Sequence, residues 1–373
     1  MAVRVLVVDD SVLYRRVLTD ALKSLPDVEV VGSAASGSSV LPKFRELKPD
    51  LITLDIEMPG MSGIEVMEAL RREALEVKVL VVSALTVSGG ALTLKALERG
   101  AFDFITKPSE GSAQENFRCI CDELAPRLRA IARRLEVQTI LRRGTPPAAS
   151  VAKTAAVSTP APLLRRAPIA ASAAASNNHQ PELVVIGVST GGPNALQTIF
   201  SALPGDLAAP IVIVQHMPPI FTKLLAGNLA AHSKLPVREA AHNEALSPGT
   251  AYVAPGGKQM RVVPALAGRR LLQLSDDPPE NCCRPAVDYL FRSVANHFPG
   301  KALAVILTGM GEDGTAGLRL LKRGGSTVIA QDEASSVVFG MPKAAIEAGV
   351  VDLVLPLEAI ADRITALVRG PQS

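Results

Sequence analysis

Short runs of aliphatic residues recur along this chain, and each is followed by a longer segment with helical periodicity. In the first third of the sequence the runs read VRVLVV, VEVVGSA, DLITLD, VKVLVVS and FDFIT. Continuous aliphatic strands that alternate with helices indicate a parallel sheet covered on both faces, because crossover connections place the helices there. The sequence from Val3 to about Arg134 therefore predicts a doubly wound α/β domain of five βα units.

A second series of apolar runs begins at Glu182, where the sequence reads ELVVIGV, APIVIVQH, KALAVILTGM and STVIAQD. Between the two series, residues 144–181 contain six prolines, twelve alanines and no acidic residue. Prolines interrupt every alanine stretch long enough to form a stable helix, so this composition favours a flexible connection. We therefore predict two doubly wound parallel-sheet α/β domains, at 1–135 and 182–373, joined by an Ala/Pro-rich linker at 136–181.

The net charge and the first twelve residues of the sequence exclude some classes of function and location. The 39 basic and 36 acidic residues leave a formal net charge of +3, and no dense basic run is interleaved with aromatic residues. This pattern argues against nucleic-acid binding. The start, MAVRVLVVDDSV, is typical of a strand and of neither a signal peptide nor a membrane span. We therefore expect a cytoplasmic protein without direct membrane insertion.

The four cysteines occur as two close pairs, Cys119 with Cys121 and Cys282 with Cys283. Neither pair has the spacing of a metal site with histidines nearby. We interpret them as reduced, structural thiols.

Polar residues stand at the ends of four runs in the first series. Asp9 and Asp10 follow the first run, Asp55 ends the third, and Ser83 and Lys107 end the fourth and fifth. Ligands of open parallel sheets bind outside the carboxyl ends of the strands, so these side chains are expected to share one crevice. A lone aspartate at a strand end more often caps the next helix. The agreement of several strand ends favours a functional site.

Three carboxylates in one crevice are suited to Mg²⁺, which prefers oxygen ligands. Asp55 is the candidate nucleophile towards a phosphoryl donor, while Asp9 and Asp10 would hold the metal together with Asp55. Ser83 and Lys107 would contact the phosphoryl oxygens after Asp55 is modified. The first domain is therefore predicted to be phosphorylated on Asp55.

The second series carries a candidate nucleophile. Ser189 lies within GVSTGG, directly after the strand ELVVI and before a helical segment, where a sharp turn would expose its hydroxyl group. The same glycines could instead form a phosphate cradle at a helix N-terminus, although the dinucleotide-binding spacing is absent. Two further strand ends favour catalysis, because IVIVQ leads into His216 and LAVILTGM leads into Glu312 and Asp313.

These positions predict a serine triad. His216 would accept the proton of Ser189, and Asp313 would orient the imidazole, with Glu312 as a competing orienting residue. The chain order Ser, His, Asp differs from that of α/β-hydrolases, so the arrangement would be a separate one. Backbone amides near Thr190 and Met310 are candidate oxyanion donors.

The first domain resembles the response-regulator receiver family through VVDDS at 7–11, LDIEMPGMSG at 54–63 and FDFITKP at 102–108. The resemblance implies a flavodoxin-like fold and places Phe104 at the position of the aromatic switch residue. It also implies Mg²⁺ as the cofactor for phosphorylation and a histidine kinase as the phosphodonor.

The second domain resembles the catalytic domain of the chemotaxis protein-glutamate methylesterase family, CheB. The resemblance rests on IGVSTGGP, VIVQHMPP, YVAPGG, RPAVDYLFRS, LTGMGEDGTAG and VFGMPKAA. It implies a Rossmann-like hydrolase domain that needs no cofactor, demethylates glutamate methyl esters on chemoreceptors and deamidates receptor glutamines. The implied nucleophile, base and orienting residue are Ser189, His216 and Asp313.

The resemblance also implies partners and regulation. The phosphodonor would be a chemotaxis histidine kinase of the CheA type, the substrate would be the cytoplasmic domain of a methyl-accepting chemoreceptor, and the unphosphorylated receiver would cover the active site. Arg284 opens a matching segment and could contact the substrate carboxyl group or cap a helix. Gln259 stands where the family commonly has a histidine, so the substrate rim departs from the pattern there.

Two alternatives from other classes remain at this point. The second domain could be a hydrolase-like binding module, although an intact triad argues against it. It could also be a nucleotide-binding output domain, which would carry a ribose-binding acid where this sequence has His216.

Overall fold

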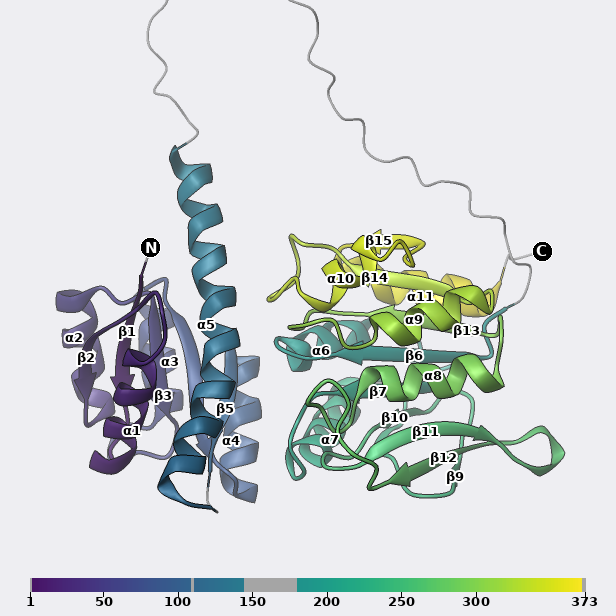
Figure 1. The fold of residues 1–373 in the computed structure, drawn as a ribbon, viewed down its shortest axis with the longest axis horizontal. Helices are drawn as coiled ribbons and strands as arrows, with labels where there is room; N and C mark the ends of the chain where they lie inside the picture. The colour runs from purple at the N-terminus through teal and green to yellow at the C-terminus, as the bar shows by residue number, and fades with distance from the viewer. Residues whose placement is uncertain (1, 109–110, 144–179, 371–373) are drawn as a thin grey trace, which may run out of the picture.

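The computed structural model describes residues 2–108, 111–143 and 180–370, which form two α/β units side by side (Figure 1). The elements of the first unit are β1 (Val3–Val8), α1 (Val12–Lys23), β2 (Val28–Ala34), the 3₁₀ turn η1 (Gly37–Ser39), α2 (Val40–Leu47), β3 (Leu51–Asp55), α3 (Gly63–Arg72), β4 (Lys78–Ala84), α4 (Val87–Glu98), β5 (Asp103–Lys107) and α5 (Ala113–Arg143).

The first unit is the predicted doubly wound domain. Its five strands form a parallel sheet in the order β2-β1-β3-β4-β5. The central strands β1 and β3 consist almost entirely of buried aliphatic residues, which explains why they read as continuous apolar runs. The strand order reverses between β1 and β3, so the crevice that can accept a ligand lies next to Asp9 and Asp55.

Helix α5 differs from the expected boundary. The linker was expected to begin at residue 136, but α5 continues to Arg143. The segment LEVQTILRR contains neither proline nor glycine and is rich in good helix formers, so nothing in it ends the helix. The remainder of the predicted linker, residues 144–179, lies outside the described residues.

The second unit contains β6 to β15 and α6 to α11. Its elements are β6 (Leu183–Val188), α6 (Gly192–Ala202), β7 (Ile211–Gln215), α7 (Phe221–His232), β8 (Val237–Glu239), β9 (Glu244–Ala245), β10 (Ala251–Val253), β11 (Gln259–Pro264), the 3₁₀ turn η2 (Leu266–Gly268), β12 (Arg270–Ser275), α8 (Val287–His297), β13 (Ala302–Ile306), α9 (Thr315–Arg323), β14 (Thr327–Gln331), α10 (Met341–Glu347), β15 (Leu353–Leu355) and α11 (Leu357–Arg369).

A parallel sheet in the order β15-β14-β13-β6-β7-β10-β8 forms the centre of this unit. The strand order reverses at β6, which lies between β13 and β7, so the loops after these three strands meet at one edge. A small antiparallel sheet, β11-β12-β9, packs through β11 against α8. This additional sheet was not predicted from the sequence.

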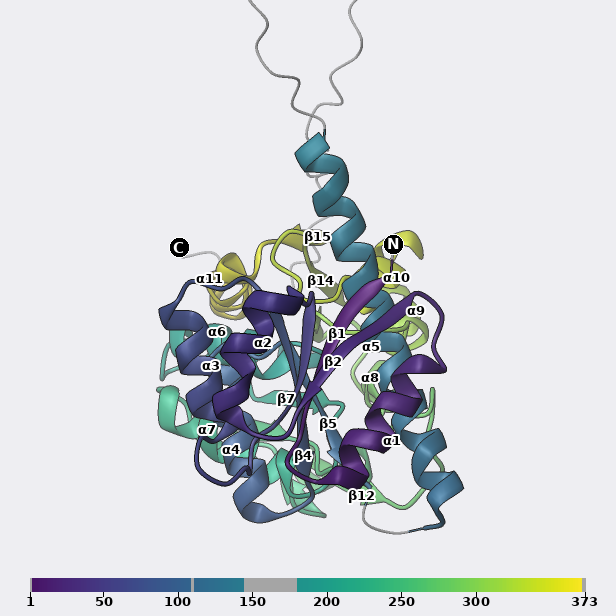
Figure 2. The same ribbon diagram turned by 90° about the vertical axis from the view of Figure 1, so that its left-hand side faces the viewer.

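The two units share a packed interface. Helix α4 of the first unit contacts α6 and α7 of the second, and Figure 2 shows the first unit in front of the second. The ring of Phe104 stacks on the ring of Phe221 with centroids 4.7 Å apart. Gly90 permits the close approach of the helices, because a Cβ atom there would lie 2.7 Å from the Cδ1 atom of Leu224 on α7.

Replacement of Phe200 tests the core of the second unit. Phe200 on α6 is fully buried, so Phe200→Ala should lower the free energy of unfolding by about 3–5 kcal/mol. Urea denaturation followed by circular dichroism measures this change. Leu266→Ala is the control, because Leu266 is 92% exposed and its loss should change stability by less than about 0.5 kcal/mol. Equal effects of the two substitutions would contradict the packing described here.

Candidate functional site

The acidic crevice of the first unit forms at the carboxyl ends of β1, β3 and β5. Lys107 Nζ lies 2.8 Å from Asp9 Oδ2 and 2.6 Å from Asp55 Oδ2. One carboxylate oxygen from each of Asp9, Asp10 and Asp55 lies within 4.8 Å of the other two. The structure therefore brings the predicted phosphoryl-acceptor and metal-binding residues together beside the predicted lysine.

Burial and hydrogen bonds shift the pKa values of the side chains in this crevice. Burial raises the pKa of Asp9 above its ordinary value, although Lys107 opposes the shift. Burial would lower the pKa of Lys107, but its hydrogen bonds to Asp55 and Asp9 outweigh that effect and raise the pKa. Three clustered carboxylates with a single ammonium group remain an oxygen-rich donor set, which is the type that Mg²⁺ binds.

The two predicted switch residues Ser83 and Phe104 contact other parts of the protein. The Ser83 hydroxyl group donates to the carbonyl oxygen of Gly89 at 3.2 Å. Phe104 is buried and faces Phe221 of the second unit. The predicted aromatic switch is therefore part of the contact between the two units.

The second cluster forms where β6, β7 and β13 end. Ser189 follows β6, and its backbone N–H donates to Thr308 O at 3.0 Å, next to the end of β13. His216 follows β7, and its backbone N–H donates to Val188 O at 3.2 Å. The tight turn after Ser189 uses Gly191 at φ 77°, a conformation that glycine adopts without strain. These contacts place Ser189 and His216 on one rim.

Asp313 is the acidic residue that meets the histidine. His216 Nε2 and Asp313 Oδ2 lie 2.8 Å apart, and Asp313 is buried. Glu312, the competing candidate, is exposed. Within the described residues, no hydrogen bond joins the Ser189 hydroxyl group to His216. The structure thus contains a formed histidine–aspartate pair with the serine on the same rim.

The first turn of α8 holds the Asp313 carboxylate. The backbone N–H groups of Val287 and Asp288 donate to it at 2.7 and 3.0 Å, and Asn281 Nδ2 donates at 2.8 Å. Burial alone would raise the pKa of Asp313, but the hydrogen bond from His216 and these backbone donors lower it. A carboxylate at a helix N-terminus is also favoured by the helix dipole. Asp313 therefore remains charged inside the protein.

The partners of His216 raise its proton affinity. Burial alone would lower the pKa of His216, but the interactions with Asp313 and with the Cys283 side chain outweigh burial and raise the pKa to about 9. The raised pKa favours the protonated form of the imidazole in this arrangement.

Comparison with known proteins identifies both units. Residues 184–364 match the family described as CheB methylesterase, and residues 5–115 match the response regulator receiver domain. A protein from Desulfotalea psychrophila called protein-glutamate methylesterase/protein-glutamine glutaminase is 46% identical over 98% of this chain and 98% of its own length. The chain belongs to the CheB methylesterase family.

Further matches come from Thermotoga maritima. A protein of that organism with the same name is 43% identical over 98% of this chain and 98% of its own length. The crystal structure of the Thermotoga maritima CheB methylesterase catalytic domain is 46% identical, with a TM-score of 0.49, and covers 50% of this chain and 97% of that domain.

In this CheB-family chain the receiver domain contacts the residue next to Ser189. The Thr190 hydroxyl group donates to Asp103 Oδ2 at 3.0 Å, and Arg127 Nε donates to the same oxygen at 2.8 Å. A second contact joins Asn194 Nδ2 to Leu97 O at 2.8 Å. The receiver therefore lies on the rim that carries the candidate nucleophile.

The remaining candidates occupy different places. In the part of the chain that the structure describes, neither the backbone N–H group of Thr190 nor that of Met310 donates a hydrogen bond. Arg284 is exposed, and its guanidinium group donates to Asp276 O at 3.3 Å. Helix α8 has Ala286 as its N-cap residue, so Arg284 does not cap it.

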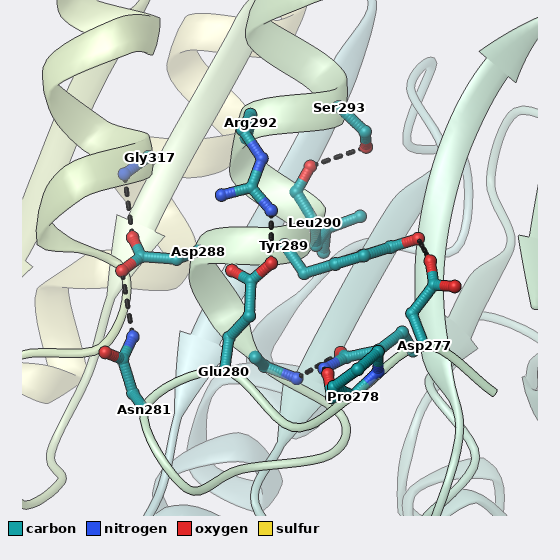
Figure 3. A network of polar contacts seen from close by, with 12 residues as sticks. Asp277, Pro278, Glu280, Asn281, Asp288, Tyr289, Leu290, Arg292, Ser293 and Gly317 are labelled. Atoms are coloured by element: carbon teal, nitrogen blue, oxygen red, sulfur yellow. Dashed lines mark hydrogen bonds and ion pairs between the residues drawn. The ribbon is translucent and has the colours of Figure 1, made fainter. Parts of the chain in front are cut away.

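Gln259, where the sequence departs from the family pattern, is fully buried and holds the loop before α8. Its side chain accepts from Ala286 N at 2.9 Å and donates to Pro278 O at 3.1 Å and to Cys283 O at 3.3 Å. Figure 3 shows the same loop tied to α8, because Glu280 pairs with Arg292 and Asn281 donates to Asp288 at 3.0 Å.

Sequence reasoning missed two residues of this site, Asn281 and Cys283. The cysteines were interpreted as structural thiols without metal-site spacing, whereas the structure brings Cys283 close to His216 and Asp313. No spacing pattern could reveal this contact, because the three residues come from loops far apart in the sequence and only the fold brings them together.

None of the helices in the described part of the chain combines the length and the apolar character that a bilayer crossing requires.

The raised pKa of His216 predicts a pH-dependent contribution to stability. Because the folded pKa of about 9 exceeds the ordinary value of 6.5, protonated His216 stabilises the fold fully below pH 6.5, and this stabilisation is lost as the pH rises through 9. The difference in free energy of unfolding between wild type and His216→Gln should therefore shrink between pH 6.5 and pH 9. Urea denaturation at several pH values measures it. A constant difference would contradict the assigned pKa.

Proposed function

We propose that this chain is a phosphorylation-regulated serine hydrolase that demethylates glutamate methyl esters on chemoreceptors and deamidates receptor glutamines. The observation that carries the proposal is the buried pair of His216 and Asp313 on the rim beside Ser189, with a separation of 2.8 Å. The names of the relatives from Desulfotalea psychrophila and Thermotoga maritima support the choice of substrate.

In the proposed reaction, Ser189 Oγ attacks the ester carbonyl carbon while His216 accepts the hydroxyl proton. Asp313 stabilises the imidazolium that forms. The proton then passes to the departing methanol, or to ammonia when the substrate is a glutamine side chain. Water attacks the acyl-serine in the second half of the reaction and releases the glutamate carboxylate. Ser189 must first come within hydrogen-bond reach of a neutral His216.

The free backbone amides of Thr190 and Met310 are suited to the oxyanion of the tetrahedral intermediate. Pre-oriented donors of this kind supply a large part of the rate enhancement in acyl transfer. Arg284 is exposed near the start of α8 and remains a candidate contact for receptor carboxylates. No cofactor is required for these steps.

Regulation is proposed to act through Asp55. Asp9, Asp10 and Asp55 would hold Mg²⁺, which neutralises charge on a phosphoryl donor when bound. Lys107 contacts both Asp9 and Asp55, so its position is expected to depend on the charge at Asp55. A chemotaxis histidine kinase of the CheA type is the proposed phosphodonor. The proposed substrate, the cytoplasmic domain of a methyl-accepting receptor, would place the reaction in the cytoplasm.

The proposed domain boundaries are a receiver at 1–135, a linker at 136–181 that begins inside helix α5, and a methylesterase domain at 182–373. Contacts of Asp103 with Thr190 and of Phe104 with Phe221 support inhibition by the unphosphorylated receiver, because they cover one side of the nucleophile's rim.

Methanol release from methylated receptor membranes tests the catalytic assignment. Wild type should release methanol, and acetyl phosphate should increase the rate. Ser189→Ala should reduce the rate by several orders of magnitude, and Asp313→Asn by about 10⁴-fold, because the imidazole loses its orienting charge. Circular dichroism spectra verify that each variant is folded. Release by Ser189→Ala at the wild-type rate would place the catalytic centre elsewhere.

The interface predicts a constitutively active variant. Gly90→Leu inserts a side chain where a Cβ atom already lies 2.7 Å from Leu224, so it should separate the domains and bring methanol release without phosphodonor close to the stimulated wild-type rate. Gly227→Leu is the matched control, because a Cβ atom at this helical position on α7 has no neighbour within 4 Å. Unchanged release by the Gly90 variant would argue against inhibition through this contact.

A further inference from the structure

The side chain of Cys283 lies beside the catalytic pair, a position that the proposed hydrolysis does not require. One ligand atom from each of His216, Cys283 and Asp313 lies within 4.8 Å of the other two. Cys283 is half-buried, and the His216 side chain is 14% exposed. The cluster therefore combines a thiol, an imidazole and a carboxylate at a position that a small ion can reach.

The loop before α8 fixes the position of this thiol. Glu280 N donates to Cys283 O at 3.1 Å, and Cys283 N donates to Glu280 O at 2.8 Å. The buried Gln259 side chain binds the same Cys283 carbonyl, and Arg292 on α8 holds Glu280 (Figure 3). The thiol is therefore presented to His216 by a tied loop, and its backbone position does not depend on the His216 contact itself.

The carboxylate of the cluster is also pre-oriented. Asn281 and the N–H groups of Val287 and Asp288 bind Asp313, as described above. In metal sites, hydrogen bonds of this kind orient the ligands and strengthen binding. The cluster therefore has three donors on three separate loops, together with the outer contacts that metal ligands usually have.

From this geometry we infer that His216, Cys283 and Asp313 form a binding site for a thiophilic divalent cation of the Zn²⁺ type. Thiolate, imidazole and carboxylate are the three side-chain ligand classes of zinc in proteins. A thiolate donor selects against Mg²⁺, which prefers oxygen. The site thus differs in metal preference from the all-carboxylate crevice of the receiver domain.

The distances require only a small adjustment. Zinc–ligand distances of about 2.0–2.3 Å place the ligand atoms of a tetrahedral site about 3.5 Å apart. The donor atoms here lie within 4.8 Å of one another. Side-chain rotations that move these atoms by about an ångström would bring them to the separations of a tetrahedral zinc site. Binding would release the thiol proton of Cys283 and the proton shared by His216 and Asp313, and a water molecule would complete the coordination.

The consequence for activity rests on the proposed function. An imidazole coordinated to a cation is a far weaker base than a free imidazole, so a bound metal would prevent His216 from activating Ser189. The cation would thus act as a reversible inhibitor of hydrolysis, and its site would overlap the catalytic site itself.

Cobalt absorption tests the binding site without reference to activity. Titration of the full-length chain with Co²⁺ should produce the thiolate-to-cobalt charge-transfer band in the near ultraviolet and the intense visible bands of a tetrahedral site. Added Zn²⁺ should displace Co²⁺ and remove both, whereas excess Mg²⁺ should not. Binding of Co²⁺ to the receiver carboxylates gives no thiolate band.

The two adjacent cysteines provide a matched pair of variants. Cys283→Ser should abolish the thiolate band, while Cys282→Ser should retain it, because Cys282 is exposed and is not part of the cluster. Loss of the band in Cys282→Ser together with its retention in Cys283→Ser would overturn the assignment. Absence of a thiolate band in wild type would overturn it as well.

Methanol release tests whether the bound cation inhibits hydrolysis. Micromolar Zn²⁺ should inhibit wild type and Cys282→Ser at least tenfold more strongly than Cys283→Ser, and a chelator should restore activity. Equal inhibition of all three proteins would overturn the inhibitory role. If wild type releases no methanol even without Zn²⁺, the proposed function fails, whereas the cobalt spectra still decide whether the metal site exists.

Discussion

The rim that carries Ser189 and His216 depends on a negative charge that is kept inside the protein. Asp313 is almost fully buried, and an isolated carboxylate in that position would be strongly disfavoured. The first turn of α8 and Asn281 supply the hydrogen bonds that replace water. The remaining interaction of the carboxylate is with His216, so the same charge fixes the imidazole. Helix α8 and the loop before it are thus as much a part of the site as the three strand ends.

The same arrangement explains why many hydrogen bonds hold the loop between β12 and α8 in place. A shift of this loop would move Asn281 away from Asp313 and would at the same time move Cys283 relative to His216. Gln259 opposes such a shift, because its side-chain amide forms hydrogen bonds with three backbone groups of the loop. A buried glutamine at this position therefore acts on the catalytic pair through the backbone, without touching the pair.

Much of this architecture could be predicted from the sequence, for a definite physical reason. Parallel strands are buried on both faces, so they read as aliphatic runs, and their polar ends mark a common edge. This reasoning found Asp9, Asp55 and Lys107, and it placed Ser189, His216 and Asp313 on one rim. It kept Glu312 as a competitor of Asp313, because the choice depends on which carboxylate faces the first turn of α8.

The features that escaped prediction depend on contacts between distant segments. The strands β9, β11 and β12 are short or partly polar, so their pairing is not visible as a run. Asn281 and Cys283 lie in a loop whose sequence has no periodicity, and their neighbours are set by the packing of α8. The expected start of the linker at residue 136 lies inside α5, although the proline- and alanine-rich composition begins only at residue 144.

Strand β5 connects the two functional regions over a very short distance. It ends at Lys107, which contacts Asp9 and Asp55, and it begins at Asp103, which accepts a hydrogen bond from Thr190 beside the nucleophile. Three residues of extended chain lie between these two positions, a span of about 13 Å. The predicted phosphorylation site and the rim that carries Ser189 therefore both contact the same edge strand. A displacement of this strand would change both contacts at once.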